Sequence, residues 1–110
     1  MFNFNTAEVD RLCAAMLTLK TKDECRAFLE DDCTIAEVQA LSQRLTAAML
    51  LRGGANYHEI SAQLGLSTAT ISRVSRSLNY GAGGYQTVLE RLDDVDAGDA
   101  PAAEGGADGE

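Results

Sequence analysis

The segment from Tyr57 to Arg76 limits what this chain can fold into more than any other part of the sequence. It has helical apolar spacing on both sides of Gly65, and glycine is the residue that tolerates the left-handed backbone of a tight turn between two helices. Ser67 is suited to cap the second helix, because its hydroxyl can accept from the first free amides. The pattern predicts a helix-turn-helix over about residues 56–78. The apolar positions expected to join its two helices are Ile60, Leu64, Leu66, Ile71 and Val74.

The remaining sequence also predicts helices, and it shows no strand alternation. Helix starts are marked where Asn or Thr is followed three residues later by Glu, as in a capping box. These pairs are Asn5 with Glu8, Thr21 with Glu24, and Thr34 with Glu37. Gly53-Gly54 is expected to end the third of these helices, and a last short helix is expected over about 85–92. The predicted fold class is all-α with about six helices.

Charge is distributed unevenly along this acidic chain, whose net charge is −8. Residues 93–110 hold seven acids and no base, residues 44–91 hold five arginines against two acids, and residues 1–43 hold eight acids against four bases. Ala, Gly, Asp and Glu dominate residues 93–110, a composition too polar to form a packed core. The sequence therefore predicts a folded domain over residues 1–92 and a disordered acidic tail over 93–110. Positive charge is concentrated in the half that holds the helix-turn-helix.

No residue pattern favours an enzyme, a metal site or a membrane protein. Cys13, Cys25 and Cys33 lack C-x-x-C spacing and His58 is the only histidine, which argues against a zinc site and a Cys-His nucleophile. The glycine-rich stretch 81–84 lacks the Lys-Ser/Thr of a phosphate-binding loop. Neither a signal peptide nor a membrane-spanning run is apparent. We expect a cytoplasmic protein without catalytic activity, bound metal or a membrane partner.

The helix after the turn carries small hydroxyl side chains and arginines on the face opposite its apolar residues. Short side chains let the start of such a helix enter the major groove of DNA, where hydroxyls bond to phosphates or base edges and methyl groups contact thymine. The preceding helix would cross the sugar-phosphate backbone. The predicted contacts to double-stranded DNA are Asn56, His58 and Ser61 on the first helix and Thr68, Ala69, Thr70, Ser72, Arg73 and Arg76 on the second. The alternative is a solvated face that binds nothing.

Two stretches resemble the tryptophan repressor superfamily. LLRGGANYHEISAQLGLSTATISRVSRSL is similar to its helix-turn-helix region, and DDCTIAEVQALSQRLTAAM to the helix that precedes it. STATISRV followed by LNYGAGGY most resembles the YerC/YecD-type branch of this family. The resemblance covers residues 5–92. It implies an all-helical homodimer with interlocked N-terminal helices, which binds palindromic operator DNA and controls transcription, usually as a repressor.

The resemblance also implies a pocket for a small-molecule effector. In the tryptophan repressor two arginines sandwich the indole ring, and the matching residues here are Arg44 and Arg73, with Thr70 and Ser77 at neighbouring polar positions. Val74 stands where the family has a glycine, which adds bulk beside the expected pocket.

Two basic DNA-contacting positions of the family are His58 and Ser61 here. We therefore predict a DNA-binding member that does not use tryptophan as corepressor and needs no cofactor. Another small-molecule effector remains open. The alternative from a different functional class is a protein-interaction module that keeps the helix-turn-helix shape without binding DNA, which the net acidity and the missing bases favour.

Overall fold

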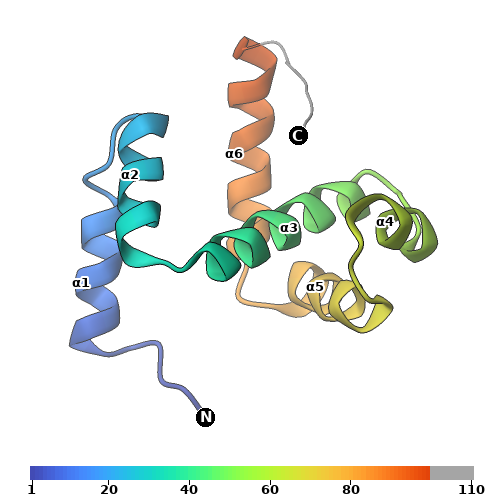
Figure 1. Ribbon diagram of the computed structural model, residues 1–110, viewed down its shortest axis with the longest axis horizontal. Helices are drawn as coiled ribbons and strands as arrows, with labels where there is room; N and C mark the ends of the chain where they lie inside the picture. The colour runs from blue at the N-terminus through green and yellow to red at the C-terminus, as the bar shows by residue number, and fades with distance from the viewer. Residues whose placement is uncertain (100–110) are drawn as a thin grey trace. The chain divides into compact units, whose positions relative to one another are not determined.

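A computed structural model describes the backbone of residues 1–99 and the side chains of residues 1–94. Over these residues the chain forms six helices and no strand, which confirms the all-α fold class (Figure 1). The chain separates into two compact units, Met1–Ala40 and the residues from Leu41 onward, and α3 contributes to both. The helices are α1 (Ala7–Met16), α2 (Lys22–Asp32), α3 (Ile35–Arg52), α4 (Tyr57–Leu64), α5 (Thr68–Tyr80) and α6 (Gly84–Asp99).

Helix α1 starts one residue later than the sequence pattern predicts. The N-cap is Thr6, whose Oγ1 accepts from the Val9 amide at 3.2 Å, and not Asn5. Asn5 donates its own amide to the Asn3 side chain at 2.9 Å. Asn and Thr are both good caps, so the choice between neighbours depends on which side-chain oxygen reaches a free amide.

The other two predicted caps lie where expected. Thr21 caps α2, because its hydroxyl accepts from the Glu24 amide at 3.1 Å. The Glu24 carboxylate accepts from the Lys20 amide at 2.8 Å, one residue before the Thr21 amide that a reciprocal capping box would use. Thr34 and Glu37 form the full reciprocal box at the start of α3, with donor–acceptor distances of 2.8 and 3.1 Å. Each such cap satisfies amides that the first helical turn leaves unpaired.

The unit Met1–Ala40 buries none of its side chains. Its amphipathic helices keep much of their apolar surface in contact with solvent: Leu17 is 86% exposed and Ile35 82% exposed. The other large apolar side chains exposed in this unit are Met1, Phe2, Phe4, Leu12 and Met16. These residues lie on the segment before α1, on α1 and its C-cap, and at the first residue of α3, and α2 contributes none of them.

The hydrophobic core lies in the second unit, where α4 and α5 lie side by side next to the C-terminal part of α3 (Figure 1). Two fully buried alanines, Ala47 and Ala48, provide the contribution of α3. The remaining core residues are Ile60 from α4, Ile71, Val74 and Leu78 from α5, and Leu89 from α6.

Three polar contacts hold the ends of these helices. Gly65, at φ 71°, has the left-handed conformation predicted for the turn, and its amide donates to the Ser61 carbonyl at 2.9 Å. Gln43 Nε2 of α3 donates to the Leu64 carbonyl at 3.4 Å, and Gln86 Nε2 of α6 donates to the Leu78 carbonyl at 2.9 Å. These carbonyls belong to final helical turns, which lack intrahelical donors.

Helix α6 does not end at Leu92 as predicted but continues to Asp99. Residues 93–99 of the predicted acidic tail are therefore helical, while the tail residues 100–110 lie outside the described part of the chain. An existing helix gains one hydrogen bond for each residue it adds. Acidic composition alone therefore marked the helix end too early.

Replacing Gly65 with alanine is expected to lower the free energy of unfolding by about 1–2 kcal/mol. An added Cβ at Gly65 meets no atom within 4 Å, so the cost arises from the left-handed backbone alone. The matched control is Gly84→Ala, where an added Cβ also meets no atom within 4 Å and φ is not positive. Denaturant unfolding at fixed protein concentration measures both. Equal stability of the two variants would contradict the proposed role of Gly65.

Candidate nucleic-acid interface

Helix α4 is held at its start by a capping box that our sequence analysis did not identify. Asn56 Oδ1 accepts from the Glu59 amide, and the Glu59 carboxylate accepts from the Asn56 amide, both at 2.8 Å. The Asn-x-x-Glu spacing was the signal that could have revealed it. Asn56, predicted as a DNA contact, therefore uses its side-chain oxygen within the motif, and its exposed amide group is the part available to a ligand.

Ser61 has a structural role that differs from the phosphate contact we predicted. Its hydroxyl donates to the Leu66 carbonyl at 2.8 Å and is partly buried. This bond joins α4 to the residue just after the glycine turn. The hydroxyl proton of Ser61 is therefore engaged inside the motif.

Helix α5 begins with the predicted cap at Ser67. Its Oγ accepts from the Thr70 amide at 3.1 Å and lies 3.0 Å from Thr70 Oγ1, to which it donates. Thr68 and Ala69, the first two residues of the helix, are exposed. Amides in a first helical turn have no intrahelical acceptor, and the helix dipole makes this end partially positive. The start of α5 is therefore suited to approach a phosphate.

The circumference of α5 has a buried side, an opposite exposed side and two flanks between them, since successive residues are rotated by about 100°. Ile71, Val74 and Leu78 are buried, as predicted. Ala69 and Arg76 lie opposite them and are exposed. One flank carries Thr68 and Ser72, and the other carries Thr70, Arg73 and Ser77. Ser72 and Thr70 are half-buried, so these two predicted contacts are less accessible than Arg73 and Arg76.

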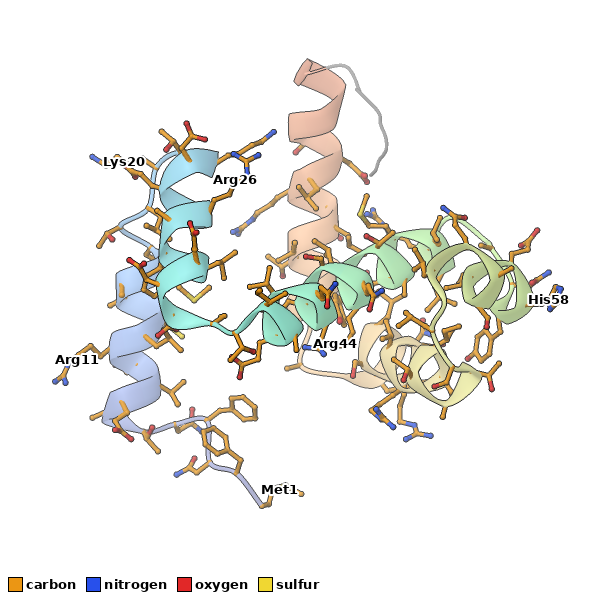
Figure 2. All side chains as sticks on the ribbon, in the orientation of Figure 1. Met1, Arg11, Lys20, Arg26, Arg44 and His58 are labelled. Atoms are coloured by element: carbon orange, nitrogen blue, oxygen red, sulfur yellow. The ribbon has the colours of Figure 1, made fainter. Side chains whose placement is uncertain are left out.

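The exposed surface of α5 is cationic. The helix has two arginines and no acidic residue. Among the described residues, ion pairs form between Arg26 and Asp23 and between Arg52 and Asp93, and neither α5 arginine takes part in one. On α4, His58 is also exposed and points away from the other helices (Figure 2). This arrangement leaves the α5 arginines available to an anionic partner.

A cavity of about 150 Å³ lies along the other flank of α5. It brings together all four residues of the predicted effector pocket, which are Arg44, Thr70, Arg73 and Ser77. Figure 2 shows Arg44 on the side of α3 that faces α5. Val74 forms part of the wall, as expected from its bulk, and Tyr85 of α6 completes the lining. Tyr85 was not among the predicted pocket residues, because no local sequence pattern places the start of α6 beside α5.

Comparison with known proteins identifies the family. The family model described as Trp repressor protein matches residues 7–93. The chain belongs to the Trp repressor family. It is 48% identical over 89 residues to YerC, an uncharacterized protein of Bacillus subtilis (strain 168), covering 81% of this chain and 86% of YerC. This similarity confirms the predicted resemblance to the YerC-type branch.

Two solved structures share this architecture. A crystal structure of a TrpR-like protein from Eubacterium eligens ATCC 27750 is 51% identical, with a TM-score of 0.78 over 82% of this chain and 93% of the other. A candidate Trp repressor from Staphylococcus aureus is 42% identical, with the same TM-score of 0.78 over 84% of this chain and 96% of the other. Membership of the Trp repressor family, together with the observed motif, makes this chain a helix-turn-helix protein of the general regulatory type.

Other types of site are not apparent in the described part of this Trp repressor family member. Residues 1–99 include no group of three or more His, Cys, Asp or Glu side chains placed to hold a metal ion. Over the same residues, every helix is too short or too polar to cross a bilayer. Cys13, Cys25 and Cys33 are free thiols.

Substituting Ser61 with alanine is expected to lower the free energy of unfolding by about 1 kcal/mol, because the Leu66 carbonyl loses its donor in a partly buried position. Ser77→Ala is the matched control, since Ser77 is exposed and alanine favours a helix interior. Thermal unfolding of both variants provides the comparison. A Ser61→Ala protein as stable as the control would show that its hydroxyl is dispensable and therefore free for other contacts.

Proposed function

We propose that this protein is a sequence-specific DNA-binding transcriptional regulator that acts in the cytoplasm, as a repressor, on palindromic operator DNA. The observation that carries the proposal is the cationic, acid-free exposed face of α5, with a capped helix start beside it. Such a helix start can enter the major groove, and its partially positive amides favour contact with phosphates. Family membership supports the same regulatory class.

The burial of each side chain suggests how the contacts divide. Arg76 and Arg73 are exposed cations suited to phosphates or to guanine. Thr68 and Ala69, exposed on the first turn, are short enough to approach base edges, while half-buried Ser72 and Thr70 contribute at the margins. On α4, the His58 ring and the Asn56 amide group would contact the phosphate backbone.

The proposed functional unit is a homodimer. The unit Met1–Ala40 buries no side chain, and the exposed apolar residues of α1, such as Leu12 and Met16, need a covering surface. A second copy of the chain provides a matching apolar surface through two-fold symmetry. Two α5 helices would then meet successive major grooves, which are about 34 Å apart along B-DNA.

Selection of bound fragments from a random duplex pool tests this function directly. We expect enrichment of a palindromic consensus, with half-sites centred about 10 base pairs apart. A palindrome would support the homodimer and sequence specificity together. Absence of any enriched sequence would reject the proposal and favour the protein-interaction module, which the net charge of −8 also suits.

Arg76→Ala and Arg73→Ala are each expected to weaken binding to the selected duplex by about tenfold at low salt, and Thr70→Ala by less. Loss of one phosphate contact should also reduce the slope of log affinity against log salt by about 0.9. Arg91→Ala is the charge-matched control, because it removes an exposed cation from α6. Fluorescence polarisation gives affinity, and circular dichroism confirms folding. Normal binding by both arginine variants would place the contact face elsewhere.

The cavity beside α5 favours a second role, control by a small anionic effector. Arg44 and Arg73 supply two cationic groups, and Thr70 and Ser77 supply hydroxyls. At about 150 Å³ the cavity suits a ligand about the size of benzene, which is smaller than tryptophan. Because Arg73 also belongs to the exposed face, an occupied cavity would change how this arginine meets DNA.

L-Tryptophan is expected to leave both the melting temperature and the affinity for the selected duplex unchanged at millimolar concentration. Val74 forms part of the cavity wall and is 3% exposed, which restricts the space for an indole ring. Thermal shift and polarisation measurements test this, with a panel of small carboxylates and phosphates as the positive search. A tryptophan-dependent gain in DNA affinity would contradict the restricted cavity.

A further inference from the structure

One acid of the C-terminal acidic run already neutralises an arginine of the second unit. Asp93 Oδ2 lies 3.0 Å from Nη1 of Arg52, so α6 pairs with the end of α3. The cations that remain on the second unit are Arg44 in the cavity, Arg91 on α6 itself, and the two arginines of α5. Among the described residues of this unit, α5 is the helix that carries two arginines outside any ion pair and no acid, whereas Arg91 lies on α6 beside Glu90 and Asp94 in the sequence.

Further acids follow α6 in the sequence. Residues 100–110 include Glu104, Asp108 and Glu110 and no base. They follow Asp99 directly in the sequence. The charge of this segment is complementary to that of the α5 face.

The length of the segment is sufficient to reach that face. Helix α6 has 16 residues and is therefore about 24 Å long. Arg76 lies about one turn, or roughly 6 Å, before the end of α5. A fully extended segment 100–110 spans about 36–40 Å. The path back along α6 to Arg76 is roughly 30 Å of helix together with the short connection 81–83. Glu110, at the end of the segment, is the acid that can reach this far.

From these observations we propose that residues 100–110 bind the α5 face through Arg76 and Arg73 and thereby compete with DNA for it. This inference rests on the proposed function and concerns the regulation of the same site. A tethered competitor reduces the fraction of protein able to bind, so it lowers affinity for every duplex by the same factor. It would thus limit occupancy of weak, non-specific sites without altering which sequence is preferred.

The first experiment compares the full-length protein with Glu104→Gln/Asp108→Asn/Glu110→Gln, using a random-sequence duplex as the probe. We expect the neutralised protein to bind about threefold to tenfold more tightly at 50 mM salt, with the difference vanishing near 500 mM salt because screening removes surface ion pairs. The matched control, Ala102→Ser/Ala103→Ser/Ala107→Ser, keeps every charge and should bind as the unmodified protein does. Equal affinity of all three proteins overturns the inference.

The second experiment locates the contact without DNA. Neutralising the tail should shift the side-chain Nε–Hε resonances of Arg76 and Arg73 in the free full-length protein, while that of Arg91 stays in place. Unchanged Arg76 and Arg73 resonances would overturn the inference. Because this measurement needs no duplex, it tests the contact between the tail and α5 even if no form of the protein binds DNA. A failure to bind DNA would reject only the proposed function.

Discussion

The left-handed turn at Gly65 is the constraint on which the rest of the second unit depends. The left-handed conformation of Gly65 reverses the chain direction, so that α5 packs against α4. A hydrogen bond from the Ser61 hydroxyl to the Leu66 carbonyl joins α4 to the residue after this turn. Gln43 of α3 reaches the same turn through the Leu64 carbonyl. With the turn in this conformation, Ile60 and Ile71 belong to the same core as the two buried alanines of α3. Burial of that side of α5 determines which of its residues face outward.

Helix α5 serves three purposes because its circumference is divided among three environments. The buried side holds it to the core, the opposite side presents Ala69 and Arg76, and one flank lines the cavity shared with α3 and α6. Arg73 lies between the outward side and the cavity. If the proposed effector and DNA both bind, a ligand in the cavity and a phosphate outside it would contact the same guanidinium, without a long-range conformational change.

The two units differ in how much of their apolar surface the single chain buries. The second unit buries a contiguous core, whereas Met1–Ala40 leaves residues such as Leu17 and Ile35 exposed although its helices are well capped. Capping contributes only locally to helix stability, and short helices depend on tertiary packing to persist in water. The N-terminal unit thus has the features of half an interface, in agreement with the homodimer proposed for this Trp repressor family member.

The sequence by itself determined the features that depend on neighbouring residues. These are the glycine turn, the Ser67 cap, the all-α class and the buried register of Ile71, Val74 and Leu78, because helical spacing and caps act within a few positions. The resemblance to a known family also named the four polar residues that line the cavity. Only the tertiary structure placed Tyr85 in that cavity, engaged the Ser61 hydroxyl, and continued α6 beyond Leu92 into the acidic run. Distances between elements and the continuation of a helix depend on three-dimensional packing and cooperative hydrogen bonding, which periodicity and composition do not encode.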